Sequence, residues 1–176
     1  MFTIDQKLPA SGYRNKEQNE PLVLFSLKER PSLFLSMDQW RFNMAVNPGE
    51  HTYNAVLHHE APVFDNPAVT FRVSDMTLRI PDEAIESLVK FACDPSVSQI
   101  QQEDLFQGIS ILDGVNVSLD IRSKAARFRM EDNLFMMTEE DGIIKTADKE
   151  YQTGIHLIRQ AIAQALGEEP DLDVEE

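Results

Sequence analysis

Alternating apolar and polar positions predict three β-strands in the first half of the chain. Residues 22–27 form a short apolar run that ends in charged residues and a proline, and residues 51–60 are rich in β-favouring side chains. Residues 69–80 alternate most clearly, as expected for a strand with two different faces. One face of this third segment carries Val69, Phe71 and Val73, and the other carries Thr70 and Arg72.

The segment 33–46 fits two different periods. Ser36 and Gln39 have the spacing of a helix capping box, and Trp40 shares a helical face with two methionines. Two leucines at the start of the segment instead continue the period of two that is typical of a strand. We favour a strand followed by a helical turn, ended by the Asn-Pro-Gly sequence at 47–49.

Two helices are expected next. Pro81 followed by two acids predicts a helix start, because negative charge is favourable at the positive end of the helix dipole. This helix should end before Pro95, and a second, shorter helix is expected over residues 96–107. The buried stripe of the first helix consists of Ile85, Leu88, Val89 and Ala92.

The Asp-Gly pair at 113–114 predicts a β-hairpin, because a type I′ turn needs the positive φ angles that these residues adopt readily. The hairpin joins residues 109–112 to residues 115–122, in which apolar and polar positions alternate. Further short strands are expected over residues 126–131, 134–138 and 143–145. Together they predict an antiparallel meander with one solvent-exposed face.

A long C-terminal helix is expected over residues 147–166, capped by Thr146 and followed by Gly167. Its apolar positions recur at helical spacing, so it should cover the apolar face of the meander. Strands followed by helices predict an α+β fold with antiparallel sheets packed against helices. The expected organisation is a flexible arm (1–21), one α+β domain (22–167) and a disordered acidic tail (168–176). An alternative division of the domain is a pair of meander–helix halves, 22–95 and 96–167.

The composition adds a strong acidic charge to this picture. The 176 residues carry 30 acids and 16 bases, a net charge of −14. Six of the acids lie in the tail, so the rest of the chain has 24 acids against 16 bases, or −8. Such a surface attracts basic partners and, on average, repels nucleic acid and anionic membranes. The tail acids are Glu168, Glu169, Asp171, Asp173, Glu175 and Glu176.

The sequence predicts a cytoplasmic protein of a bacterium or of a virus-infected host cell. No apolar run approaches the roughly 18–20 residues that span a bilayer, and the first residues lack the pattern of a secretory signal. The single cysteine, Cys93, excludes an intramolecular disulfide and fits a reducing compartment.

Histidines provide the only cluster with metal-ligand chemistry. In a strand, His58 and Glu60 share a face while His59 points away, so at most two of these three residues can meet one ion. His51 joins His59 on the opposite face only if the strand is unbroken. Because a zinc site needs three or four protein ligands, we expect surface histidines and no metal or cofactor.

Catalytic signatures are missing from the sequence. It contains no nucleophile elbow and no glycine-rich phosphate loop. Cys93 falls on the apolar side of a predicted helix end, where a buried, inert thiol is expected. An enzyme would need the fold to bring His58, His156 and carboxylates together, so we do not expect one.

A basic cluster around the turn that follows residue 122 is the best candidate for binding nucleic acid. Arg127 and Arg129 project from one strand face, and Arg122 and Lys124 lie at the adjoining turn. Single strands also need aromatic side chains for stacking, but Phe71 and Phe128 alternate away from the arginines and are expected in the core. Trp40 beside Arg41 offers a second candidate surface. Cross-strand pairing with Asp120 and Glu131 is the structural alternative.

Two functions follow from these features. The first is a non-catalytic, acidic protein-binding module, an inhibitor of the immunity or viral anti-host type that acts on a basic partner. The alternative is a single-stranded DNA-binding protein of replication or recombination, whose acidic tail competes for the basic surface. An exposed strand edge or the last helix is compatible with a homodimer.

Overall fold

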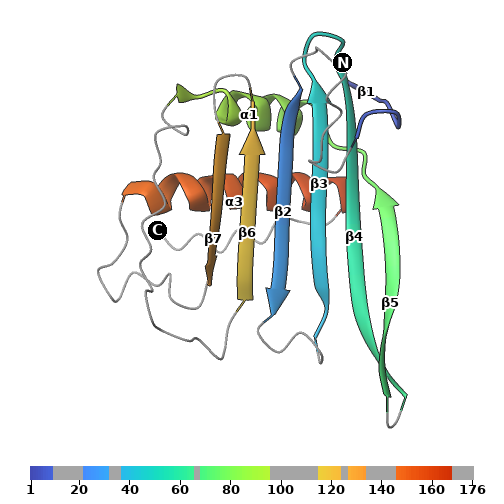
Figure 1. The fold of residues 1–176 in the computed structure, drawn as a ribbon. Helices are drawn as coiled ribbons and strands as arrows, with labels where there is room; N and C mark the ends of the chain where they lie inside the picture. Colours follow the sequence, from blue (N-terminus) through green and yellow to red (C-terminus); the bar gives the residue numbers. More distant parts are fainter. Residues whose placement is uncertain are drawn as a thin grey trace.

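The computed structural model describes residues 1–9, 22–31, 37–65, 68–95, 115–123, 127–133 and 146–167. The strands are β1 (Thr3–Ile4), β2 (Val23–Pro31), β3 (Gln39–Asn47), β4 (Thr52–Asp65), β5 (Ala68–Thr77), β6 (Val115–Arg122) and β7 (Arg127–Asn133). The helices are α1 (Asp82–Ala92) and α3 (Thr146–Leu166). This mixed composition confirms the expected α+β class (Figure 1).

All seven strands belong to one sheet. Its order is β1-β4-β3-β2-β6-β7, and β5 pairs with the distal part of β4. Every pair is antiparallel except β1 with β4. Strand β2 lies between β3 and β6, so the strands of the first and second halves of the sequence share a sheet.

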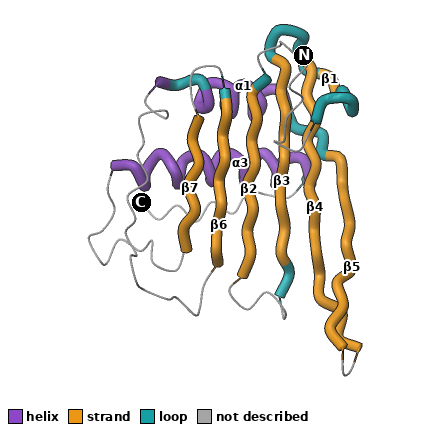
Figure 2. Tube along the Cα trace, in the orientation of Figure 1, coloured by secondary structure: helices purple, strands orange, loops and turns teal. Residues whose placement is uncertain are grey.

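Both described helices cover the same face of this sheet, called here the inner face (Figures 1 and 2). Strands β2 and β6 bury alternate positions, as their apolar pattern predicts, whereas β3 does so only in its first part, because residues 44–47 are all buried. Leu27, for example, lies opposite both Phe42 and Leu119, and all three side chains are fully buried. The helices complete the core with Ile85, Leu88, Ala92, Ile155, Ile158, Ala161 and Ile162.

Helix α3 approaches the sheet closely at Gly154. A Cβ atom added there would lie 2.9 Å from Leu119 Cδ2 and 3.1 Å from Phe91 Cε1. The missing side chain therefore lets α3 pack against β6 and α1 at the same point.

The β4–β5 hairpin extends past the end of the neighbouring strands (Figure 1). Its tip leaves Phe64, Val69 and Val73 exposed by 65%, 42% and 56%. Phe71 is only half-buried, so the expectation that it belongs to the core is wrong. The expected alternation is present, but Val69, Phe71 and Val73 lie on the face of the sheet opposite the helices, so no described helix covers them.

Two expectations for the N-terminal half also need correction. The segment Gln39–Asn47 is a single strand with no helical turn, because pairing with β2 and β4 holds it extended along its whole length. Residues 1–9 are not a loose arm. Strand β1 pairs with β4, Leu8 is only 6% exposed, and Asn54 Nδ2 donates a hydrogen bond to the Leu8 carbonyl at 2.8 Å.

Several expected elements lie outside the described residues. These are most of the arm, the helix at 96–107, the strand and turn at 109–114, the strands at 134–138 and 143–145, and the acidic tail. Within the described part of the chain, neither helix has the length and apolar character needed to cross a bilayer.

Candidate functional site

The face of the sheet opposite the helices is called here the outer face, and its central part is polar. The odd-numbered residues of β2 are buried under the helices, so its even-numbered residues point to the outer face. Directly paired residues of an antiparallel sheet point to the same side, so the partners of these even-numbered residues belong to the outer face as well. One row crosses five strands through the residues Ser118, Lys28, Arg41, His58 and Asp75. The outer face is therefore assembled from segments that are far apart in the sequence.

The register concentrates positive charge on this face. Its basic positions are Lys28, Arg30, Arg41, Arg122, Arg127 and Arg129, and its acidic positions are Glu60, Asp75, Asp120 and Glu131. Six bases minus four acids give +2, while the whole chain carries −14. The other described residues hold six bases and twelve acids, or −6, so the described part of the chain gathers its positive charge on the outer face.

Lys28 and Arg41 form the centre of the outer face. They are direct cross-strand partners, a geometry that places Cβ atoms about 4.5–5.5 Å apart. Among the described residues, neither side chain has a hydrogen-bond or ion-pair partner. Two like charges in this position destabilise a sheet, and an anion placed between them would remove that cost.

The second basic group lies at the β6–β7 edge. Arg122 donates two hydrogen bonds to Asp120, from Nε at 3.0 Å and from a terminal nitrogen at 2.6 Å. Arg127 is paired with Arg122 and Arg129 with Asp120, so the register places both arginines on the outer face. Lys124 lies outside the described residues. Asp120 therefore neutralises Arg122 in part, through a contact within β6 and not across strands.

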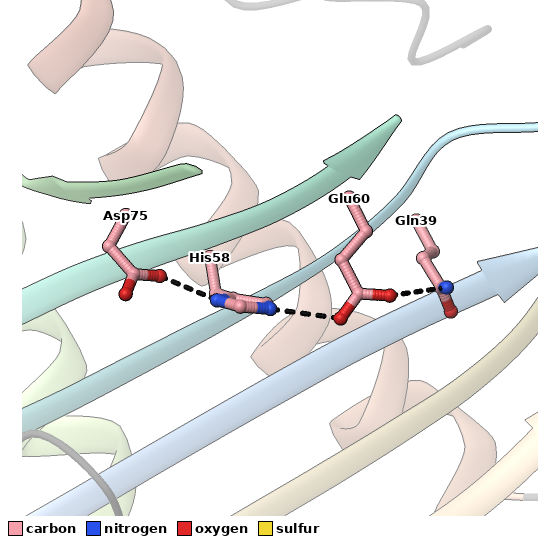
Figure 3. Close-up of polar contacts among 4 residues, drawn as sticks. All are labelled: Gln39, His58, Glu60 and Asp75. Carbon is pink, nitrogen blue, oxygen red and sulfur yellow. Dashed lines mark hydrogen bonds and ion pairs between the residues drawn. The ribbon is translucent and has the colours of Figure 1, made fainter. Parts of the chain in front are cut away.

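His58 adjoins the central pair and lies between two carboxylates (Figure 3). Its Nδ1 is 2.5 Å from Asp75 Oδ1, and its Nε2 is 3.0 Å from Glu60 Oε1. Gln39 Nε2 donates to the other Glu60 oxygen at 2.6 Å. Hydrogen bonds to Glu60 and Asp75 raise the pKa of His58, because both carboxylates stabilise the imidazolium form.

The other candidate metal ligands are not gathered with His58. His59 points to the inner side and contacts Asp38 Oδ2 at 2.9 Å. His51 precedes β4, and its ring lies 5.2 Å from that of Phe2. With a rise of about 3.3 Å per residue, His51 and His59 lie roughly 26 Å apart along the chain. Within the described ranges, no three acids, histidines or cysteines have a geometry suited to a metal ion.

Three more candidate residues are also dispersed. Trp40 is the cross-strand partner of His59 and packs against the core, so it lies on the opposite face from Arg41. Cys93 is exposed rather than buried, because the helix ends at Ala92 and leaves this residue in the cap position. His156 is exposed on α3, which covers the inner face, whereas His58 belongs to the outer face.

One partly buried ion pair was not expected from the sequence. Glu29 of β2 is 9% exposed on the inner face, and Arg159 of α3 donates two hydrogen bonds to its Oε1, at 2.8 and 2.5 Å. Burial raises the pKa of Glu29, and the arginine only partly offsets this effect. The pair connects the sheet to α3 and lies away from the outer face.

Lys28 and Arg30 were also missed as site residues. The period of two in β2 gives a signal for them, since Ser26, Lys28 and Arg30 are the polar positions of an otherwise apolar strand. No family model matches this chain, and no curated protein matches it either.

Proposed function

We propose that this protein is a non-catalytic binding protein whose outer sheet face binds a single-stranded nucleic acid. The observation that carries the proposal is the opposed pair of Lys28 and Arg41, which has no counter-ion among the described residues. The pair lies on a face with net positive charge in a chain that is otherwise strongly acidic. A chain of phosphates supplies the missing negative charge.

Aromatic positions support a single strand rather than a duplex. Pro62 pairs with Phe71 and Phe64 with Val69, at positions that continue the His58 side of β4 toward the hairpin tip. Phe64 is 65% exposed. Bases of a single strand can stack on such rings while the phosphates follow the basic row, whereas the bases of a duplex are already stacked on each other.

The test is a fluorescence anisotropy titration of a labelled single-stranded oligonucleotide at several salt concentrations. We expect the double variant Lys28→Gln/Arg41→Gln to bind more weakly than the wild type. Its salt dependence should be smaller by about 1.4 in the slope of log K against log salt, since each phosphate contact on a single strand contributes about 0.7. Lys90→Gln is the matched control, because Lys90 is exposed on α1, away from the outer face. An unchanged affinity and slope in the double variant would contradict the proposal.

The acidic tail, residues 168–176, competes with nucleic acid in this proposal. Its deletion should therefore raise the affinity for the oligonucleotide. A tail that only solubilises the protein would leave the affinity unchanged.

The second candidate function is an inhibitor of the immunity or viral anti-host type, which acts on a basic protein. The observation that favours it is the acidic charge of the chain, −14 in total, to which the exposed Glu83 and Glu86 on α1 contribute. Electrostatic steering by such a surface accelerates association with a basic partner. The test is binding of a labelled oligolysine. Binding of this probe, together with no binding of the oligonucleotide at low salt, would favour the inhibitor.

A further inference from the structure

We infer that His58 acts as a proton-operated switch of the outer face, which binds single-stranded nucleic acid more tightly when the imidazole carries its second proton. The inference deepens the proposed function and rests on it. Through His58, the pH would regulate binding at the surface centred on Lys28 and Arg41.

The hydrogen-bond geometry around His58 requires the charged ring. An ionised carboxylate only accepts hydrogen bonds, and a neutral imidazole has one donor and one acceptor nitrogen. With carboxylate oxygens 2.5 Å from Nδ1 and 3.0 Å from Nε2, both nitrogens must donate. Loss of one proton therefore turns one of the two contacts into a repulsion between lone pairs.

Asp75 is the carboxylate expected to move when the ring becomes neutral. Its side chain is 66% exposed, whereas that of Glu60 is 32% exposed and is also held by Gln39 at 2.6 Å. The neutral ring can keep its donor bond to Glu60, while Asp75 turns into solvent as an uncompensated negative charge on the edge of the site.

Charges on every strand around His58 determine the sign of the effect. Arg41 of β3 lies directly opposite, with Lys28 of β2 beyond it, and Asp75 of β5 lies opposite on the other side. Glu60 is on the same strand. The formal charges of these four residues cancel. The local net charge is therefore +1 when His58 is an imidazolium and zero when it is neutral. The diagonal neighbours are the uncharged residues Gln39, Asn43, Val73 and Thr77.

The raised pKa of His58 supports this assignment. Its causes are the hydrogen bonds to Glu60 and to Asp75, the same two contacts that the charged ring requires. The pKa of His58 is therefore higher than its ordinary value of about 6.5.

The experiment is an anisotropy titration of a labelled 20-nucleotide oligothymidylate at low salt, repeated from pH 5.5 to pH 8.5. Thymidine has no group that titrates in this range. The proteins are the wild type, His58→Gln and His59→Gln. The control is closely matched, because His59 is the next residue but points to the inner side. Circular dichroism of each variant verifies that the fold is intact.

We expect the wild type to bind about fivefold more weakly after the pH passes the pKa of His58, the effect of one unit charge about 4 Å from a phosphate in water. His58→Gln should bind with the weaker affinity throughout and show a flat profile, while His59→Gln should follow the wild type. Two results would overturn the switch and leave the proposed function intact. The first is binding by the wild type that does not depend on pH, and the second is a pH profile that is as flat for His59→Gln as for His58→Gln. No binding of the wild type at any pH would instead overturn the proposed function itself.

Discussion

Replacement of Lys28 with glutamate should stabilise the fold while it removes anion binding. In the wild type, Lys28 faces Arg41 directly across the β2–β3 pair, and neither side chain has a described counter-ion. The variant Lys28→Glu turns this repulsion into an attraction. Stability and binding are then expected to change in opposite directions, as they do where a binding site is maintained at the expense of stability.

The magnitude follows from the register. Two unit charges about 5 Å apart in water interact by about 0.8 kcal/mol, so the sign reversal amounts to about 1.6 kcal/mol. Arg41 is exposed, and exposed pairs are weakened by solvent and by the entropy of long side chains, which leaves about 0.5–1 kcal/mol. With a urea dependence of about 2 kcal/mol per molar, the unfolding midpoint should rise by about 0.4 M.

The assay is urea unfolding, followed by circular dichroism, at about 20 mM and at about 1 M sodium chloride. The low concentration leaves the interaction between the two charges largely unscreened, and the high concentration screens it. Arg41→Glu should give a similar gain, and the double variant Lys28→Glu/Arg41→Glu should return toward the wild type, because it restores two like charges. At high salt, the differences should shrink. A midpoint that falls at low salt, or a gain of equal size at both salt concentrations, would refute the reasoning.

Three other changes test the remaining parts of the structure. Arg159→Ala leaves the buried carboxylate of Glu29 without its partner, so the free energy of unfolding should fall by about 1–3 kcal/mol. Because burial raises the pKa of Glu29, this loss should become smaller as the pH falls and protonation relieves the buried charge, and a loss that does not change with pH would contradict it. Gly154→Val should cost about 1–3 kcal/mol, since its Cβ would lie 2.9 Å from Leu119, and an unchanged melting temperature would count against the close packing. Finally, His58 has a raised pKa, so its stabilising contribution is complete below about pH 6.5 and is lost as the pH rises through the higher folded-state value. His58→Gln should remove this part of the pH dependence of urea unfolding, and an unaltered dependence would exclude it.

The alternation of side chains was enough to predict several strands and their buried faces. Val117, Leu119 and Ile121 are each at most 1% exposed, as the period of two indicates, because local pattern and burial coincide where helices cover the sheet. The first helix was likewise located from its proline, its acidic first turn and its apolar stripe. In these segments, the local preference and the tertiary environment agree.

Other features depend on contacts that a local pattern does not contain. Trp40 and Met44 are four residues apart, a spacing that suits one face of a helix and also one face of a strand. Pairing with β2 and β4 decides in favour of the strand. In β5, the local pattern predicts burial that does not occur. Its alternation is that of a buried strand, but Val73 remains 56% exposed. Period predicts which side chains share a face, whereas the layer that covers the face depends on the whole fold.

The buried side chains of the inner face also maintain the candidate site on the outer face. Lys28, Arg41 and His58 form a row only in the observed register of β2, β3 and β4. A slip of one residue would turn Arg41 toward the helices and bring the fully buried Phe42 to the surface, because successive side chains point to opposite faces. The cost of exposing Phe42 and burying an arginine holds the strands in place. The apolar contacts on the inner face therefore fix the opposition of Lys28 and Arg41 on the outer face, although no apolar side chain of the core needs to contact the bound anion.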